Sequence, residues 1–271
     1  MMLTATIVNQ KGGVCKTTIC QNLGPLLATK YHKRVLLIDL DSSGNLSNFF
    51  GVRPAPDNEL GAARVLNDID CAPTENIVPT RFEGVFVMPG NQTLGVTERN
   101  IKSDDFTPQQ YRLKMQLEKV QKDYDYCFID CPPTVNNSVI VINALSCSDD
   151  VIIPCTPNMN SMDGVGAIAD MVNKARRFYN PSLAIRGVVF CRITRKTLDK
   201  MLLQQQLAVP RFRTYIREGT GVAEYSLAES LTFVESDPRS KATHDMENFA
   251  AEYLGEAFPY PDELPPELKQ F

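Results

Sequence analysis

The stretch Lys11-Gly12-Gly13-Val14-Cys15-Lys16-Thr17-Thr18 decides the fold of this chain. An apolar run at residues 6–9 precedes it and predicts a strand, and residues 19–30 follow it and predict a helix. A glycine-rich turn between a strand and a helix points several backbone N–H groups at one spot, where the helix N-terminus also favours anions. The eight residues therefore predict a loop that binds the phosphates of a nucleotide.

Three side chains of this loop carry the chemistry. Lys16 supplies a positive charge for the β- and γ-phosphates, and Thr17 supplies a hydroxyl for a magnesium ion. The usual pattern G-x-x-x-x-G-K-[ST] has glycine where this chain has Gln10, and a second lysine, Lys11, follows. Lys11 has two interpretations: a cation that reaches the nucleotide of a second subunit, or a solvated loop lysine. Spacing alone does not choose between them.

Length and composition bound the class of protein. The 271 residues fit one large α/β domain or two small ones, and 43% hydrophobic with 22% charged residues is ordinary for a soluble protein. A net charge of −4 argues against a uniformly basic nucleic-acid binder, so DNA contact needs a local basic patch. Because no apolar run is long enough to cross a bilayer and no signal-peptide layout is present, we expect a cytoplasmic protein.

The cysteines and histidines do not predict a metal centre. The eight cysteines are scattered and none forms a C-x-x-C pair, which argues against zinc and thioredoxin-like sites. In a cytosolic protein they are expected to be reduced, buried, small hydrophobic residues. His32 and His244 lie far apart without ligand-spaced companions, so we expect no transition-metal site built by the protein.

Short β-rich apolar runs recur along the chain, with helical stretches between several of them. This alternation predicts an α/β fold: a mostly parallel twisted sheet with helices on both faces. Because no linker divides the chain, we expect a single P-loop NTPase domain over residues 1–258 and a proline-rich, acidic tail over 259–271, on the surface or disordered. The predicted strands are residues 3–9, 34–39, 85–88, 126–130, 151–154 and 185–191.

Helix periodicity is clear in two later segments. Residues 109–122 place Leu113, Leu117 and Val120 on one face, and the stretch from 246 to 254 repeats this pattern, so both predict core-facing helices. Within the first predicted helix, Gly24-Pro25 predicts a kink or a short break. Residues 51–80 are the most loop-like interior stretch.

Acidic residues follow two of the predicted strands. Residues 34–39 end in Asp39, with Asp41 two positions on, and residues 126–130 end in Asp130. The carboxyl ends of parallel strands lie on the ligand side of a sheet, beside the phosphate loop. Four hydrophobic residues followed by Asp130 form a Walker B pattern, in which the carboxylate holds magnesium through water. Asp39 and Asp41 alternate about the strand axis, so they need not share a role.

The loop, the Asp39-Leu40-Asp41 stretch and Asp130-Cys131-Pro132-Pro133 together resemble the ParA/MinD superfamily of deviant Walker A ATPases. The chain is most similar to the ParA/Soj branch, which partitions plasmids and chromosomes. The resemblance implies ATP and Mg²⁺ as cofactors and catalytic roles for Lys11, Lys16 and Asp41. It places Asp39 near the magnesium ion beside Thr17 and Asp130, gives Asp41 the attacking water, and makes Pro132-Pro133 a switch that senses the γ-phosphate.

Two positions depart from the family pattern. Cys15 stands where relatives usually carry glycine, so its Cβ narrows the phosphate space, and a glycine-only backbone angle there would be strained. Either the substitution is tolerated, or it slows hydrolysis or weakens nucleotide binding. The Ser42-Ser43 pair replaces the usual Pro-Gln, which leaves the shape of that switch loop open.

The resemblance also implies non-specific DNA binding by an ATP-bound homodimer, through basic residues late in the chain. Arg195 is the best single candidate because residues 194–198 resemble a family segment whose arginine contacts DNA. In a later family segment, Glu218 and Gly221 replace two arginines, so this face either binds DNA through other cations or is merely solvated. The candidates are Arg195, Lys196, Arg211, Arg213 and Arg217.

The expected function is therefore an ATP-dependent dimerising switch that partitions DNA, stimulated by a ParB-like partner and associated with the nucleoid. Because the tail lacks a basic amphipathic helix, we expect no membrane anchor. Because no helix-turn-helix segment precedes the loop, we expect no sequence-specific operator binding by an N-terminal domain. One alternative is an iron–sulfur carrier or reductase, for which Cys131 and Cys155 are the nearest ligand candidates. Another is a non-hydrolysing adaptor, suggested by Cys15 and Ser42-Ser43. A tyrosine autokinase is not expected, because no tyrosine cluster ends the chain.

Overall fold

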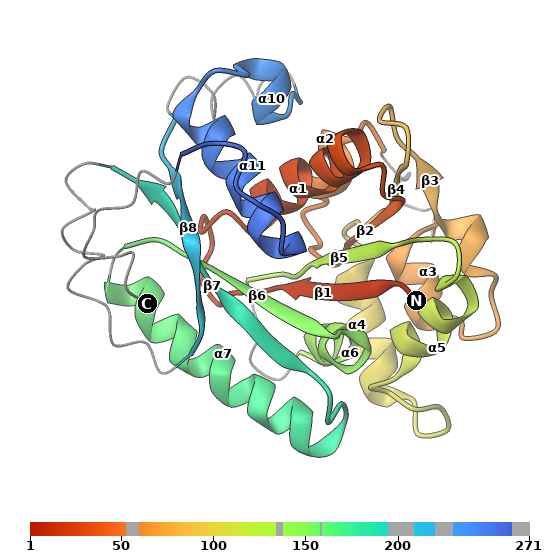
Figure 1. Cartoon of the computed structure of the whole chain (residues 1–271). Helices are drawn as coiled ribbons and strands as arrows, with labels where there is room; N and C mark the ends of the chain where they lie inside the picture. The colour runs from red at the N-terminus through yellow and green to blue at the C-terminus, as the bar shows by residue number, and fades with distance from the viewer. Residues whose placement is uncertain (53–59, 134–137, 158, 195–208, 220–229, 262–271) are drawn as a thin grey trace.

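The structure is a computed structural model that describes residues 1–52, 60–133, 138–157, 159–194, 209–219 and 230–261. Its centre is one eight-stranded sheet with the order β3-β4-β2-β5-β1-β6-β7-β8 (Figure 1). The short strand β3 pairs antiparallel with β4, and the other strand pairs are parallel, which confirms the predicted α/β class. The strands are β1 (Leu3–Ile7), β2 (Val35–Asp39), β3 (Val78–Pro79), β4 (Val85–Met88), β5 (Tyr126–Asp130), β6 (Asp150–Cys155), β7 (Ala184–Ile193) and β8 (Arg211–Arg217).

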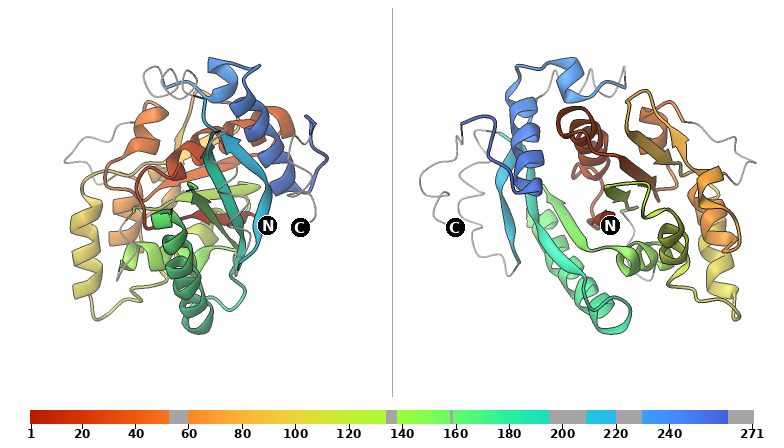
Figure 2. Two further views of the ribbon diagram at one scale, coloured as in Figure 1. Left: turned by 90° about the vertical axis from the view of Figure 1, so that its left-hand side faces the viewer. Right: turned by 45° about the vertical axis from the view of Figure 1, so that its right-hand side comes forward.

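Helices cover both faces of the sheet, as predicted (Figures 1 and 2). Helices α1, α2, α10 and α11 pack on one face, and α3 to α7 pack on the other. The helices are α1 (Lys16–Tyr31), α2 (Asn45–Phe49), α3 (Ala62–Asn67), α4 (Leu94–Ser103), α5 (Arg112–Val120), α6 (Val139–Cys147), α7 (Met159–Phe178), α10 (Phe233–Ser236) and α11 (Lys241–Leu254), with a 3-10 turn at Pro73–Asn76. Among the described helices, none has the length and hydropathy needed to span a membrane.

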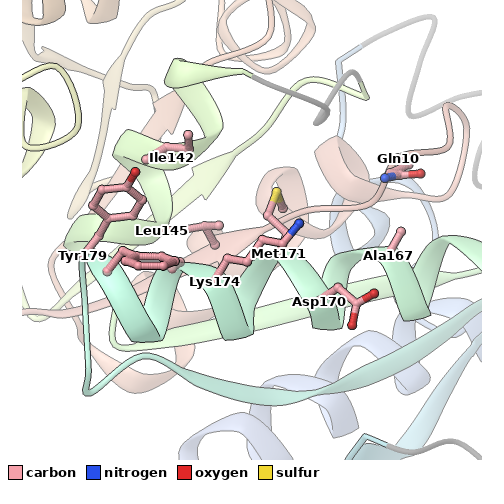
Figure 3. A pocket seen from close by; sticks show the side chains of 10 residues that line it. Gln10, Ile142, Leu145, Ala167, Asp170, Met171, Lys174 and Tyr179 are labelled. Atoms are coloured by element: carbon pink, nitrogen blue, oxygen red, sulfur yellow. The ribbon is translucent and has the colours of Figure 1, made fainter.

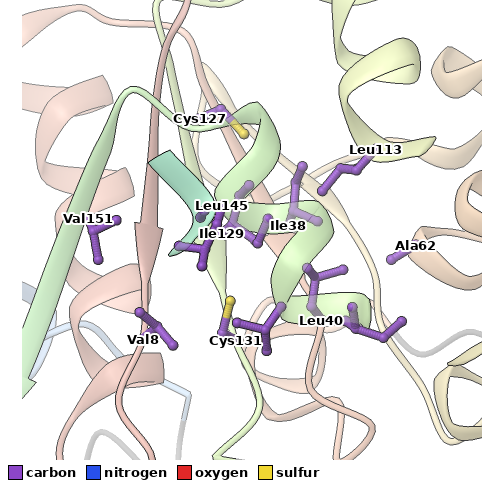
Figure 4. Close-up of a cluster of buried hydrophobic side chains, with 14 of the residues drawn as sticks. Val8, Ile38, Leu40, Ala62, Leu113, Cys127, Ile129, Cys131, Leu145 and Val151 are labelled. Carbon is purple, nitrogen blue, oxygen red and sulfur yellow. The ribbon is translucent and has the colours of Figure 1, made fainter. Parts of the chain in front are cut away.

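Successive residues of a buried strand point to opposite faces of the sheet, so they pack into two separate hydrophobic cores. On β2, Val35 and Leu37 pack beneath α1 and α11, whereas Leu36 and Ile38 pack toward α3 to α6. Figure 4 shows the second core, where Ile38 and Leu40 lie among side chains of α5 and α6. Because both faces are covered, β2 is apolar along its whole length rather than alternating, which is typical of parallel sheets.

The two amphipathic stretches lie in helices that face the core, as predicted. Leu113, Leu117 and Val120 of α5 are buried, and so are Met246 and Phe249 of α11. The observed boundaries differ from the predicted ones by a few residues, because helix ends depend on local capping rather than on the apolar repeat. The end of α11, for example, is set by Gly255, which adopts a left-handed conformation.

The predicted break at Gly24-Pro25 does not occur, because α1 runs without interruption from Lys16 to Tyr31. Pro25 cannot donate a backbone hydrogen bond, yet its own carbonyl accepts one from Thr29 Oγ1 at 2.8 Å. The surrounding residues of the helix, including Leu23 and Leu27, are fully buried. Burial of the helix between the sheet and α11 therefore outweighs the local cost of the proline.

The stretch predicted as the most loop-like contains more regular structure than expected. Helix α3, the 3-10 turn and β3 all lie between residues 60 and 80, and residues 53–59 lie outside the described part of the chain. Distant side chains hold this segment: Asn76 Oδ1 accepts from Gly61 N at 2.9 Å, and the buried Arg112 donates to Leu66 O at 3.0 Å. Such long-range contacts leave no local pattern in the sequence.

The first residues of the predicted tail dock on α11. The ring of Tyr260 stacks on His244 with 3.8 Å between ring centroids. Its backbone N–H also donates to Asn248 Oδ1 at 3.1 Å. The tail is therefore a surface segment up to residue 261, and residues 262–271 lie outside the described part.

Candidate nucleotide site

The predicted phosphate loop joins the carboxyl end of β1 to the N-terminus of α1. Gly13 and Cys15 both adopt left-handed backbone conformations, with φ of 73° and 74°, and these angles turn the chain sharply. Cys15 is the N-cap of α1, and its side chain caps none of the first backbone N–H groups. The N–H groups at this helix end are therefore available to an anion.

Asn9, which lies just before the loop and is not part of the motif, holds the start of the loop by hydrogen bonds. Asn9 is fully buried, and its side-chain amide donates to Pro154 O on β6 at 2.7 Å. Its Oδ1 accepts from Lys11 N at 3.1 Å. Asn9 thus ties the start of the loop to the neighbouring strand, a role that depends on β1 and β6 being adjacent.

A cavity of about 730 Å³ lies against this loop. It combines most of the predicted phosphate-binding residues with Asp41 and Pro133, whereas Val14 is buried beneath the loop and Lys11 does not line it. The described residues that line it are Gly12, Gly13, Cys15, Lys16, Thr17, Thr18, Gln21, Asp41, Ser43, Asn45, Asn48, Phe49, Pro133 and Ser230.

The two loop lysines occupy different environments. Lys16 is only 7% exposed, and its ammonium folds back over the loop to donate to Lys11 O at 3.1 Å. Lys11 is half-buried. The structure therefore places Lys16 on the wall of the cavity, whereas Lys11 is a half-buried residue at the start of the loop.

Beneath the loop, the sheet brings Thr17, Asp39 and Asp130 together. Strands β2 and β5 are neighbours, and their register pairs Asp39 with Asp130. Thr17 Oγ1 donates to Asp130 Oδ2 at 2.6 Å. Three residues that lie far apart in the sequence therefore meet at one point, as the parallel-sheet argument predicts.

Burial dominates the electrostatics of the two carboxyl groups. Burial raises the pKa of Asp39 to about 6, against hydrogen bonds from Ser47 that lower it. Burial, and then the neighbouring Asp39, raises the pKa of Asp130 well above its usual range. Asp130 Oδ1 is buried without a hydrogen-bond partner among the described residues. Two adjacent buried carboxylates with an unsatisfied oxygen fit a divalent cation, which prefers such oxygen ligands.

The described residues alone do not provide a full set of metal ligands. Within the described part of the chain, no group of three or more His, Cys, Asp or Glu residues could hold a metal ion. A magnesium ion at Thr17 and Asp130 would therefore take its remaining oxygen ligands from the nucleotide phosphates and water, which is usual for Mg²⁺ in nucleotide sites.

Asp41 differs from Asp39, as their alternation along the chain predicts. Asp39 is fully buried, whereas Asp41 is half-buried and lines the cavity. Its Oδ1 accepts from Ser43 N at 2.9 Å, within the serine pair that departs from the family pattern. Pro133 lines the same cavity, and Pro132 is half-buried beside it.

Two further residues complete the surroundings of Asp39. Ser47 on α2 donates to Asp39 Oδ2 from both its backbone N–H (2.9 Å) and its hydroxyl (2.6 Å). Gly90 packs so closely that a Cβ there would lie 2.3 Å from Asp39 O, so only glycine fits. A Pro-Gly pair directly after the strand Val85–Met88 is a usable sequence signal for Gly90. For Ser47 the sequence offers none.

None of the described DNA candidates lines this cavity. Arg195 and Lys196 lie outside the described residues. Arg211, Arg213 and Arg217 all lie on β8, at the edge of the sheet. Arg217 forms a two-point ion pair with Asp245, at 2.6 and 2.8 Å.

The other two arginines of β8 differ in exposure. Arg213 is exposed, with its guanidinium 5.3 Å from the centre of the Phe258 ring. Burial lowers the pKa of Arg211, which is half-buried. The strand therefore presents three arginines in three different environments.

The thiols do not form the exposed pair that an iron–sulfur centre requires. All eight cysteines are free, and Cys131 and Cys155 are fully buried. Burial raises the pKa of both thiols, to about 12 for Cys155. The predicted role of most cysteines as buried hydrophobic residues is confirmed, although Cys15, Cys71 and Cys147 are only half-buried.

A second cavity, of about 470 Å³, lies between α6 and α7 (Figure 3). Its wall is formed mainly by apolar side chains such as Ile142, Met171 and Phe178. From the phosphate-loop region, Gln10 alone among the described residues reaches it. The first cavity, which collects the charged motif residues, is therefore the candidate site.

Comparisons with known proteins agree with this site. The AAA domain family (AAA_31) matches residues 2–185. The sporulation initiation inhibitor protein Soj of Bacillus subtilis (strain 168) is 35% identical over 191 residues, which cover 70% of this chain and 73% of Soj. The chromosome partitioning protein ParA of Caulobacter vibrioides (strain NA1000 / CB15N) is 35% identical over 198 residues, covering 70% and 69%.

Among solved structures, cobyrinic acid a,c-diamide synthase from Mycobacterium smegmatis, with a bound ATP analog and magnesium, superposes with a TM-score of 0.80. The two chains are 28% identical, and the match covers 94% of each. These comparisons confirm the resemblance drawn from the three motifs. The chain belongs to the AAA_31 family of P-loop ATPases, together with the partition proteins ParA and Soj.

Proposed function

We propose that this protein is an ATP-dependent, dimerising switch ATPase that partitions DNA and hydrolyses ATP to ADP and phosphate. The observation that carries the proposal is the meeting of Thr17, Asp39 and Asp130 beneath the phosphate loop, with one buried oxygen of Asp130 unsatisfied. Such a site needs a cation, and a cation there would bridge the protein to nucleotide phosphates. The Mg²⁺ ion would neutralise charge on the transferred phosphoryl group.

Each motif residue has a proposed role in this site. The backbone of residues 11–18 binds the phosphates, and the ammonium of Lys16, held over the loop, binds the β- and γ-phosphates. Thr17, Asp39 and Asp130 hold magnesium directly or through water. Asp41, which faces the cavity, orients the attacking water, and Pro132 and Pro133 sense the γ-phosphate.

A homodimer would complete the site through Lys11. This lysine lies at the edge of the loop and does not line the cavity of its own subunit. For this reason we assign its ammonium to the nucleotide of a second subunit rather than to the one beside Lys16. A cation supplied in trans stabilises charge in the transition state of phosphoryl transfer. A ParB-like partner would stimulate this otherwise weak hydrolysis.

Non-specific DNA binding is proposed for the ATP-bound dimer, which would place the protein on the nucleoid in the cytoplasm. Arg195, Lys196, Arg211 and Arg213 are the proposed contacts, with exposed Arg213 the foremost of the described ones. A contact by Arg217 would require it to leave Asp245. Phosphate contacts of this kind make affinity fall steeply with salt.

The test is sedimentation velocity with and without ATP and Mg²⁺, on and off a non-specific duplex. We expect monomers without nucleotide, dimers with ATP, and comigration of the dimers with the duplex. Lys11→Ala should remain monomeric with ATP, whereas the exposed loop variant Lys122→Ala should dimerise like the unmodified protein. Unmodified protein that stays monomeric at saturating ATP contradicts the switch.

A non-hydrolysing adaptor is the second candidate, and the left-handed conformation of Cys15 directly before Lys16 favours it. A side chain at this angle is strained, and it borders the space of the phosphates. Phosphate release above background, in the presence of DNA and a partner extract from the same host, would exclude the adaptor.

A further inference from the structure

Arg81, in the turn between β3 and β4, bridges two parts of the chain that line the nucleotide cavity. One nitrogen of its guanidinium donates to Ser230 O at 2.8 Å and to Glu235 Oε2 at 2.7 Å. The guanidinium carbon lies 4.4 Å from the centre of the Phe82 ring and 6.0 Å from that of Phe49. Phe49 and Ser230 both line the cavity of about 730 Å³, whereas Arg81 is not among the described lining residues.

The segment before α10 is held from two sides. Ser230 has a φ of 55°, which is uncommon for a residue other than glycine, and the bond from the guanidinium fixes its carbonyl group. The Glu235 carboxylate also accepts from Thr232 N at 2.8 Å, and these two residues form a capping box at the start of α10. The next residue, Phe233, donates its backbone N–H to Asn22 Oδ1 at 2.7 Å, which ties α10 to α1.

On the α2 side, an aromatic cluster connects the same arginine to the cavity. Phe49 packs edge-to-face on Phe50 with 5.0 Å between the ring centroids, and Phe50 packs on Phe82 at 6.1 Å. A planar guanidinium stacks on such rings, which the compact ammonium of a lysine does less well. Arg81 therefore ties the Phe49 side of the cavity wall to the Ser230 side.

The wall between Phe49 and Ser230 also offers hydrogen-bonding groups to a ligand. Gln21 of α1 lines the cavity and is only 5% exposed, and its side-chain amide has no hydrogen-bond partner among the described residues. Asn45 and Asn48 of α2 line the same cavity. A buried amide without a partner is costly unless a ligand pairs with it. This wall is therefore suited to contact a ligand that extends from the phosphate loop.

We propose that Arg81 is a positioning residue for nucleotide binding: it holds Phe49 and Ser230 in place as one wall of the cavity, and it thereby raises the affinity for ATP. This role rests on the proposed function, because ATP is taken as the ligand of the cavity. An exposed ion pair with Glu235 alone would contribute little to stability. Arg81 differs from such a pair because it also fixes two residues of the cavity wall.

The expected effect is on binding more than on the rate of hydrolysis. Without Arg81, the ligand itself must order the wall, so part of the binding free energy is lost to that ordering. The loop and the residues proposed to hold magnesium keep their own contacts. A rise in KM that exceeds any change in kcat is the signature of lost binding that is common to the ground state and the transition state.

The test is calorimetric titration with ATP and Mg²⁺ of the unmodified protein, Arg81→Ala and Arg81→Lys. We expect the Kd for ATP to rise by about tenfold in Arg81→Ala. In Arg81→Lys the rise should be smaller, about threefold, because the ammonium can still donate to Ser230 O but does not stack as well on the two rings. In basal hydrolysis, the KM should rise by similar factors, whereas kcat should change by less. Arg81→Lys alone carries the test if Arg81→Ala does not fold.

Arg34→Ala is the matched control. The guanidinium of Arg34 also lies over two rings, 4.8 Å from the centre of Phe86 and 5.8 Å from that of Tyr124, and it donates to Asp123 O at 2.7 Å. This arginine precedes the first residue of β2, at the end of the parallel strands opposite the phosphate loop. The control variant should bind ATP like the unmodified protein.

A double variant tests whether the effect passes through the wall. If Arg81 acts through Phe49, the losses of affinity in Arg81→Ala and Phe49→Leu should be less than additive when the two changes are combined. Fully additive losses would overturn this route.

The remaining outcomes separate the role of Arg81 from the proposed function. A Kd in Arg81→Ala equal to that of the unmodified protein overturns the role and leaves the function intact, because ATP still binds. An equal rise in Arg34→Ala also overturns it, since the effect would then follow from lost stability. Unmodified protein that binds no ATP overturns both.

Discussion

The phosphate-loop end of the sheet and its β8 edge handle charge in opposite ways. Beneath the loop, Asp39 and Asp130 are buried side by side, and one oxygen of Asp130 lacks a hydrogen-bond partner among the described residues. At the β8 edge, Arg217 is held by Asp245, and Arg192 by Glu218. Buried charge that the protein leaves unbalanced is costly unless a ligand compensates it, whereas paired charge already serves stability. This comparison favours the phosphate-loop end as the proposed ligand site.

The largest expected effect tests the loop end directly. Lys16→Ala removes the ammonium that lies over the phosphate loop, so nucleotide phosphates lose a charge-assisted contact in a largely buried position. We expect affinity for ATP to fall by about 100-fold or more, measured by calorimetry. The exposed lysine variant Lys122→Ala should bind ATP like the unmodified protein. Equal affinity in Lys16→Ala would remove the loop as the phosphate site.

Asp130→Asn tests whether the two buried carboxyl groups lower the stability of the nucleotide-free protein. It should raise stability and lower activity together. An amide in place of the carboxyl group relieves the burial of two adjacent acids, so the nucleotide-free protein should gain about 1–3 kcal/mol in unfolding free energy. Magnesium-dependent phosphate release should fall by about 100-fold. Thermal unfolding and a phosphate assay measure the two effects.

The control for this prediction is Asp123→Asn, which changes an exposed acid beyond α5. It should alter neither stability nor turnover appreciably, because surface charges of this kind contribute little. A fall in the stability of Asp130→Asn would mean that the hydrogen bond from Thr17 outweighs the burial of charge, and the comparison between the two regions would fail.

The sequence was most informative where the structure is local. The loop, the apolar strands and the acids that end them follow from residues within one segment, and the parallel sheet then brings Asp39 and Asp130 together. The predicted strands do not include β8, although Phe212 and Thr214 alternate with exposed or half-buried arginines. Three basic residues in this segment favour a surface patch, and they mask the alternation that predicts a strand.

What the sequence could not provide depends on contacts between distant segments. Ser47 supports Asp39, and Asn9 supports the loop, only because strands and helices far apart in the chain are packed together. The absence of the predicted break at Pro25 has the same origin, since burial of α1 outweighs a local rule. Tertiary packing of this kind overrides local preference and leaves no short pattern to recognise.

At the β8 edge of the sheet, the variants Arg217→Ala and Arg213→Ala should differ in stability, because Arg217 is in an ion pair and Arg213 is exposed. Arg217→Ala removes the guanidinium that donates two charge-assisted hydrogen bonds to the buried Asp245, so we expect a loss of about 2–4 kcal/mol in unfolding free energy. Arg213→Ala should change stability by less than about 1 kcal/mol. Chemical denaturation of both variants measures the difference. Equal, small effects would mean that the β8 edge carries no stabilising charge pair.

The smallest expected effect concerns the strained residue inside the loop. Cys15→Gly removes the cost of a side chain in the left-handed conformation, which is about 1–2 kcal/mol, but it also removes the packing of the thiol against the core. We therefore expect a net gain of at most about 1 kcal/mol in unfolding free energy, measured by chemical denaturation. Turnover of the same variant decides between the two interpretations of Cys15. Faster hydrolysis by Cys15→Gly would mean that the strained cysteine slows the reaction. Unchanged turnover with unchanged affinity for ATP would mean that cysteine is tolerated at position 15.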